Sequence, residues 1–103
     1  MSGVTVAGTT GSAGSWSYQF NSPTAIMFDP AGYMYILDSG NGRIQKWFPG
    51  ATYGSTVLQA SFATPLGMQL DRVNNLVVAD TNNHQIVSFG LLCRKCCMYY
   101  LNF

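Results

Sequence analysis

Short runs of apolar residues, separated by polar and turn-forming residues, recur along most of the chain. Runs rich in Val, Ile, Tyr and Phe, and bounded by Gly, Pro, Asn and Asp, are typical of β-strands. The pattern predicts strands at residues 24–28, 33–37, 43–48, 56–60, 66–70, 76–79 and 85–89. The chain has no Glu, a residue common in long helices, so we expect little or no helix.

The predicted strands belong to a unit that repeats after 42 residues. The stretch DSGNGRI at residues 38–44 returns as DTNNHQI at residues 80–86, with no gap between the two alignments. Six pairs of aligned residues are identical: Phe20 and Phe62, Pro23 and Pro65, Asp29 and Asp71, Asp38 and Asp80, Asn41 and Asn83, Ile44 and Ile86. The chain is therefore predicted to be a repeat protein.

Each unit is predicted to be a four-stranded antiparallel meander. Repeats of about 40 to 45 residues with four strands are typical of β-propeller blades. The second strands, at residues 33–37 and 76–79, are nearly continuous apolar runs, as expected for strands covered on both faces. We expect an all-β fold, a β-propeller fragment whose parts are the end of a preceding blade (3–19), a first repeat (20–61), an incomplete second repeat (62–90) and a C-terminal tail (91–103).

The order of residues in each unit resembles the NHL repeat. That order is Pro, an apolar run, Asp, a turn, an apolar run ending in Asp, then Asn and a strand containing Ile, and it covers about residues 3 to 90. The NHL family forms propellers of about six blades, so the resemblance implies that further blades or self-association are needed to close the ring. The second copy departs from the first at Gln85, which replaces the basic Arg43.

All four acidic residues are Asp, at positions 29, 38, 71 and 80, which are two pairs separated by the repeat length. Each precedes a loop rich in turn-forming residues, where its carboxylate can accept backbone N–H bonds and hold the turn closed. We therefore predict structural roles for Asp29, Asp38, Asp71 and Asp80, and left-handed or otherwise tight conformations for Asn41 and Asn83. Arg43 is expected to lie against Asp38 or a neighbouring blade.

No combination of residues points to catalysis, a metal or a cofactor. Each Asp is reproduced in the next repeat and has no second acid nearby, which argues against a catalytic pair. His84 is the only histidine, whereas zinc sites need three or four convergent ligands. The net charge of +1 gives no basic surface for nucleic acid. We predict no catalytic residue, no metal site and no cofactor.

The C-terminal tail differs from the repeats. It holds all three cysteines, Cys93, Cys96 and Cys97, which could bind a metal or be lipidated, although a zinc site would lack a fourth ligand. The favoured interpretation is a weakly packed terminus. Neither a secretory signal nor an apolar stretch of about 18 residues is visible, so membrane spanning is not predicted and the compartment stays open.

The meander places alternate loops at opposite ends of the unit. Residues 21–24, 39–43, 61–65 and 81–85 are predicted to share one end, which we call the loop end. Because binding residues are often carried by loops on a rigid scaffold, we predict that the loop end binds a partner through Ser39, Asn41, Arg43, Thr81, Asn83, His84 and Gln85. This polar, nearly neutral set suits a protein or peptide.

The function predicted from these features is a non-enzymatic scaffold for protein–protein interaction. The resemblance leaves two alternatives open. One is a fragment of a propeller enzyme, either a metal-dependent lyase or a lactonase-like hydrolase, whose catalytic residues lie on other blades. The other is the substrate-recognition region of a tripartite-motif-type ubiquitin ligase.

Overall fold

The computed structural model describes residues 2–60, 65–72, 75–90 and 99–102. Its elements are β1 (Pro23–Phe28), β2 (Met34–Asp38), η1 (Ser39–Asn41), β3 (Arg43–Trp47), β4 (Ser55–Gln59), β5 (Pro65–Leu70), β6 (Asn75–Asp80), η2 (Thr81–Asn83), β7 (Gln85–Gly90) and β8 (Tyr99–Asn102). The two η elements are short 3-10 turns, and no α-helix occurs in the described ranges. All seven strands predicted from the sequence are present, with small shifts at their ends.

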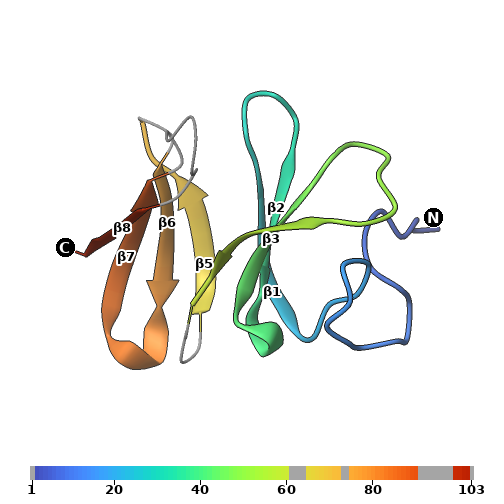
Figure 1. The fold of residues 1–103 in the computed structure, drawn as a ribbon, viewed down its shortest axis with the longest axis horizontal. Coiled ribbons are helices and arrows are strands. Elements are labelled where there is room, and N and C mark those ends of the chain that lie inside the picture. Colours follow the sequence, from blue (N-terminus) through green and yellow to red (C-terminus); the bar gives the residue numbers. More distant parts are fainter. Residues whose placement is uncertain (1, 61–64, 73–74, 91–98, 103) are drawn as a thin grey trace.

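The strands form two separate antiparallel sheets of four strands each (Figure 1). The first sheet has the order β1-β2-β3-β4 and the second has the order β5-β6-β7-β8, so each sheet is a simple meander. The register repeats as well, because Leu37 pairs with Ile44 in the first sheet and Ala79 with Ile86 in the second. The predicted first repeat thus corresponds to the complete first sheet, and the second repeat to the first three strands of the second sheet.

The last strand was not predicted from the sequence. Residues Tyr99–Asn102 pair antiparallel with β7 and give the second sheet its fourth strand. The backbone of this part of the tail is therefore paired to the second sheet, while the weak packing expected for the terminus stays a prediction. Its run of Tyr and Leu has the composition of a strand. Without it, the edge of β7 that faces away from β6 would have no strand partner. Cys93, Cys96 and Cys97 lie outside the described residues.

The two sheets pack against each other through apolar side chains. One face of the first sheet, which we call its back face, contributes Tyr35, Leu37 and Ile44. The facing side of the second sheet, its front face, contributes the buried side chains Leu76, Val78, Val87 and Phe89. The sheets approach each other most closely along β1 and β5, where the Thr24 hydroxyl donates to the Pro65 carbonyl at 2.7 Å.

A second apolar cluster lies on the front face of the first sheet. There Met34, Ile36 and Trp47 pack against residues from two other parts of the chain. Ala7 and Phe20 belong to the N-terminal segment, residues 2–20, and Ala51 belongs to the loop after β3. The rings of Phe20 and Trp47 are 5.6 Å apart between centroids. Both faces of the first sheet are therefore covered at β2, which is buried along its whole length, whereas Ile26 and Phe28 of β1 stay exposed.

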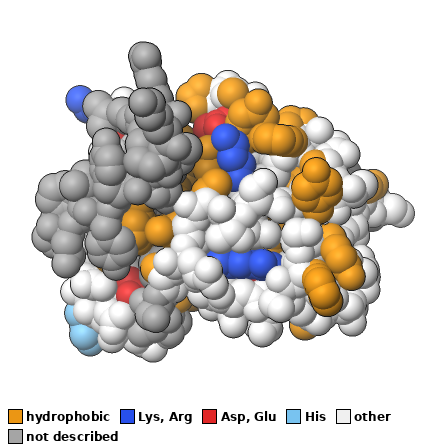
Figure 2. Space-filling model, in the orientation of Figure 1, with side chains coloured by type: hydrophobic (Ala, Val, Ile, Leu, Met, Phe, Trp, Pro, Cys, Tyr) orange, Lys and Arg blue, Asp and Glu red, His pale blue; other side chains and the backbone are white. Residues whose placement is uncertain are grey.

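The second sheet is covered less completely. Along β6, buried residues alternate with half-buried ones, so the prediction of a strand covered on both faces is confirmed for β2 and not for β6. Large apolar side chains stay exposed on the surface, including those of Ile26, Phe28 and Ile86. Figure 2 shows hydrophobic side chains gathered in several patches on one side of the molecule. Among the described residues, no helix is long and apolar enough to cross a membrane.

Two equivalent isoleucines test the stacking of the sheets. Ile44 is fully buried between them, whereas Ile86, its counterpart in the second repeat, is 57% exposed. We expect Ile44→Ala to lower the free energy of unfolding by about 2–5 kcal/mol, because it leaves a cavity in the core. The matched control, Ile86→Ala, should cost about 1 kcal/mol or less. Urea denaturation of dilute protein measures both, and equal losses would contradict the stacking.

Candidate functional site

The loop end predicted from the meander is present for its described residues, and residues 61–64 of this prediction lie outside them. The η1 loop and the η2 loop lie at the same end of the two sheets (Figure 1). Close contacts tie neighbouring loops together, since the Gly40 amide donates to the Asn21 carbonyl at 2.8 Å and the Thr24 and Ser39 hydroxyls are hydrogen-bonded. The turn between β1 and β2 lies at the opposite end (Figure 1).

Asp38 is the centre of the first loop. Its side chain is fully buried, at the point where β2 ends. The Oδ1 atom accepts the backbone N–H of Asn21 at 2.7 Å, and Oδ2 accepts from Asn41 Nδ2 and Arg43 Nε, both at 2.8 Å. The predicted backbone N–H bond is present but comes from Asn21, and the bonds to the loop itself come from the side chains of Asn41 and Arg43. The same carboxylate also fixes the chain that enters β1.

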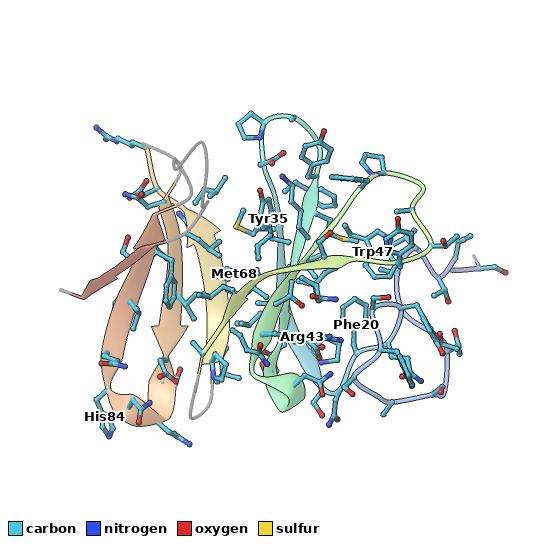
Figure 3. All side chains as sticks on the ribbon, in the orientation of Figure 1. Phe20, Tyr35, Arg43, Trp47, Met68 and His84 are labelled. Carbon is cyan, nitrogen blue, oxygen red and sulfur yellow. The ribbon has the colours of Figure 1, made fainter. Side chains whose placement is uncertain are left out.

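Arg43 uses its guanidinium to hold the N-terminal segment. Besides the ion pair with Asp38, Nη1 donates to the Ser15 carbonyl at 2.9 Å, and Nη2 donates to those of Trp16 and Gln19 at 3.0 and 2.9 Å. Figure 3 shows Arg43 between the first sheet and this segment. The expected Asp38 contact is confirmed. Arg43 was also predicted to bind a partner at the surface of the loop end. The structure corrects this prediction, because Arg43 is buried and only 8% exposed.

The carbonyl groups that Arg43 binds were not foreseen from the sequence. Every residue has a backbone carbonyl, so the sequence does not show which of these groups will accept a hydrogen bond. The one available signal was an arginine at the start of a predicted strand. Gln19 belongs to the same structure, since it is buried and its Nε2 donates to the Ser12 hydroxyl at 3.1 Å. The N-terminal segment is therefore bound to the first sheet by polar contacts as well as by Phe20.

The second loop repeats the lock in part. Asp80 is almost fully buried, and Asn83 Nδ2 donates to its Oδ2 at 2.7 Å, as Asn41 does to Asp38. This bond ties Asp80 to the η2 turn through a side chain, and the backbone bonds predicted for Asp80 stay a prediction. Gln85 occupies the position of Arg43, yet its side chain is exposed rather than buried. The two loops thus share a fold and differ at this repeat position, where the first has a buried cation and the second an exposed amide.

Asn41 and Asn83 have the tight conformation that the prediction allowed beside the left-handed one. Asn41 and Asn83 lie in the 3-10 turns, where their side chains bond the Asp carboxylates. The positive φ falls one residue later, at Gly42 (φ 60°) and at His84 (φ 54°). The left-handed residue thus follows the 3-10 turn in which the Asn side chain bonds the Asp carboxylate. A non-glycine residue therefore adopts the left-handed conformation in the second loop.

Asp29 and Asp71 close the turns at the opposite end, as predicted. Asp29 Oδ1 accepts the backbone N–H groups of Ala31 and Tyr33, both at 3.0 Å, and Asp71 Oδ1 accepts that of Asn75 at 2.9 Å. The Tyr35 hydroxyl donates to Asp29 Oδ2 at 3.2 Å. Burial, together with the charge of Asp29, raises the pKa of Tyr35 to about 12.

Among the seven residues predicted to bind a partner, the exposed ones come from the second repeat. Thr81, Asn83, His84 and Gln85 are exposed, while Ser39 and Asn41 are partly buried. His84 lies at the tip of its loop (Figure 3). The surface is polar and carries no Lys, Arg or Asp side chain among these six residues. Their role in binding stays a prediction. Within the described residues, no three His, Cys, Asp or Glu side chains gather to hold a metal ion.

Comparison with models of known protein families finds no match, and comparison with curated protein sequences finds none either. The likeness to the NHL repeat therefore depends on the repeated motif alone.

The contacts of Arg43 lead to a first test at this site. Replacing it with the residue of the second repeat, Arg43→Gln, leaves the buried Asp38 carboxylate without its cation. We expect the free energy of unfolding to fall by about 3–5 kcal/mol. Residues 2–20 should also lose protection in hydrogen exchange, because three of their carbonyl groups lose a donor. The control Gln85→Ala should change stability by about 0.5 kcal/mol or less, and an unchanged Arg43→Gln variant would refute the clamp.

The backbone at His84 leads to a second test. The left-handed conformation costs a residue with a Cβ about 1–2 kcal/mol of folding free energy, and glycine avoids this cost. About half of the gain from glycine is lost, because glycine has more conformational freedom in the unfolded chain. His84→Gly should therefore raise the free energy of unfolding by about 0.5–1 kcal/mol. In the reciprocal variant, Gly42→Ala, the new Cβ would lie 3.0 Å from the Ala60 carbonyl oxygen and should destabilise the protein. Thermal unfolding measures both changes. A less stable His84→Gly protein would contradict the strain.

Proposed function

We propose that the chain is a non-enzymatic interaction module, built from NHL-like β-propeller repeats, that contacts a protein or peptide through its loop end. The observation that carries the proposal is the recurrence of one loop structure at the same end of two consecutive sheets. A buried Asp and its Asn partner build the loop each time. The scaffold is repeated, whereas the exposed residues on it differ.

The packing of the sheets supports the propeller part of the proposal. In propellers, consecutive four-stranded blades pack face to face around an axis. The two sheets of this chain have the same strand order and register, and their first strands, β1 and β5, make the most extensive contact between them. First strands that lie side by side are what neighbouring blades around an axis require. Closing such a ring needs further blades or further copies of the chain.

The chemistry of the loop end supports a polypeptide partner. The exposed hydroxyl, amide and imidazole groups of Thr81, Asn83, His84 and Gln85 can donate and accept hydrogen bonds without a net charge. Anchoring of the loops through Asp38 and Asp80 lowers the ordering cost of binding. Gly42 and Arg43 of the first repeat correspond to His84 and Gln85 of the second, so the second repeat presents side chains that the first lacks.

A pair of arginine substitutions at opposite ends of the sheets tests this proposal. Thr81→Arg alters the loop end, and Ala31→Arg adds the same side chain to the exposed β1–β2 turn. A partner first recovered with the wild-type chain and then purified should bind Thr81→Arg at least about tenfold more weakly and Ala31→Arg within about twofold of wild type. Isothermal titration calorimetry measures both affinities. Weakening by Ala31→Arg alone would refute the use of the loop end.

A further inference from the structure

The two outer faces of the stacked sheets consist of residues equivalent to those that pack between the sheets. Inside the chain, the back face of the first sheet meets the front face of the second. Because the repeat is offset by 42 residues, each position in this interface has an equivalent in the other sheet. The equivalents form the back face of the second sheet and the front face of the first. Both of these surfaces are at least partly open.

The back face of the second sheet is the more open one. Ile86, Val77 and Ala79 stand where the first sheet has Ile44, Tyr35 and Leu37. The first sheet's residues are buried, with Ile44 at 0% exposure, but Ile86 is 57% exposed. An open groove of about 410 Å³ runs over this face and is lined by Gly67, Gln69, Val77, Ala79 and Ile86 among others. No described segment of the chain buries Ile86.

The front face of the first sheet is open along β1. Ile26 and Phe28 are 59% and 61% exposed, although their equivalents in the second sheet, Met68 and Leu70, pack into the core between the sheets. Met68 is labelled between the sheets in Figure 3. The N-terminal segment covers the rest of this face at Met34, Ile36 and Trp47. A second apolar groove, lined by Val6, Phe28 and Phe48, lies beside it.

We infer that the occupant of the open back face is a second copy of this chain, docked head to tail through its front face along β1. The docked surfaces continue the interface already present within the chain, because Ile26 and Phe28 occupy the repeat positions of Met68 and Leu70, and Ile86 occupies that of Ile44. This contact is heterologous, so it leaves one open surface of each kind and leads to a ring or a chain of copies. The inference depends on the stacked repeats of the proposed function and not on binding at the loop end.

Substitutions of two exposed residues, Ile86 and Phe28, test the two docking surfaces independently. Ile86→Lys blocks the back face and leaves the front face intact, while Phe28→Glu does the reverse. Since both side chains are exposed, circular dichroism and the unfolding midpoint should stay near wild-type values. The milder variants Ile86→Ser and Phe28→Ser serve in the same way if a charged variant fails to fold.

Analytical ultracentrifugation over a range of concentrations gives the answer. The wild-type chain should form dimers and larger species, and each variant alone should associate at least about tenfold more weakly. An equimolar mixture of the two variants should form a dimer and nothing larger, because one intact front face meets one intact back face. A wild-type chain that stays monomeric, variants that associate like the wild type, or a mixture without dimers would each overturn the inference. Loop-end binding by the monomeric variants is measured separately, so either proposal can fail alone.

Discussion

The buried carboxylate of Asp38 is the constraint on which the first half of the molecule depends. A charge removed from water needs a full set of partners, and Asp38 obtains them from three parts of the chain: Asn21, Asn41 and Arg43. Arg43 in turn satisfies carbonyl groups of the N-terminal segment. One ion pair thereby joins a turn, the entry to the first sheet and the segment that covers this sheet.

Apolar stacking is the second constraint, and it acts between units rather than within them. A sheet with two apolar faces is stable only when both are covered, and a repeat protein meets this need by placing units next to each other. In this chain the first sheet has a neighbour on each side: the N-terminal segment and the second sheet. The second sheet has one described neighbour. The difference between Ile44 and Ile86 follows from position in the stack and not from the residues themselves.

Most of the architecture could be predicted from the sequence, because the strands and turns repeat at a fixed interval along the chain. The repeat at 42 residues located the strands, the turn-locking aspartates and the shared end of the loops. The missing parts depend on tertiary context. The burial of Arg43 is determined by backbone carbonyls, which have no signature, and β8 pairs across a long connection. The sequence also left open whether Asn83 is left-handed or otherwise tight; Asn83 lies in a 3-10 turn, and His84 after it is left-handed.

The unequal covering of the sheets has a consequence for motion. Local opening requires less energy where fewer apolar contacts are broken, so the molecule has a gradient of local stability that descends from the first sheet to the second. The amide groups of β2, buried along the whole strand, stand at the high end of this gradient, and the exposed η2 loop with His84 stands at the low end. The loop that presents the most exposed polar groups is thus carried by the half of the protein that can adjust most readily to another surface.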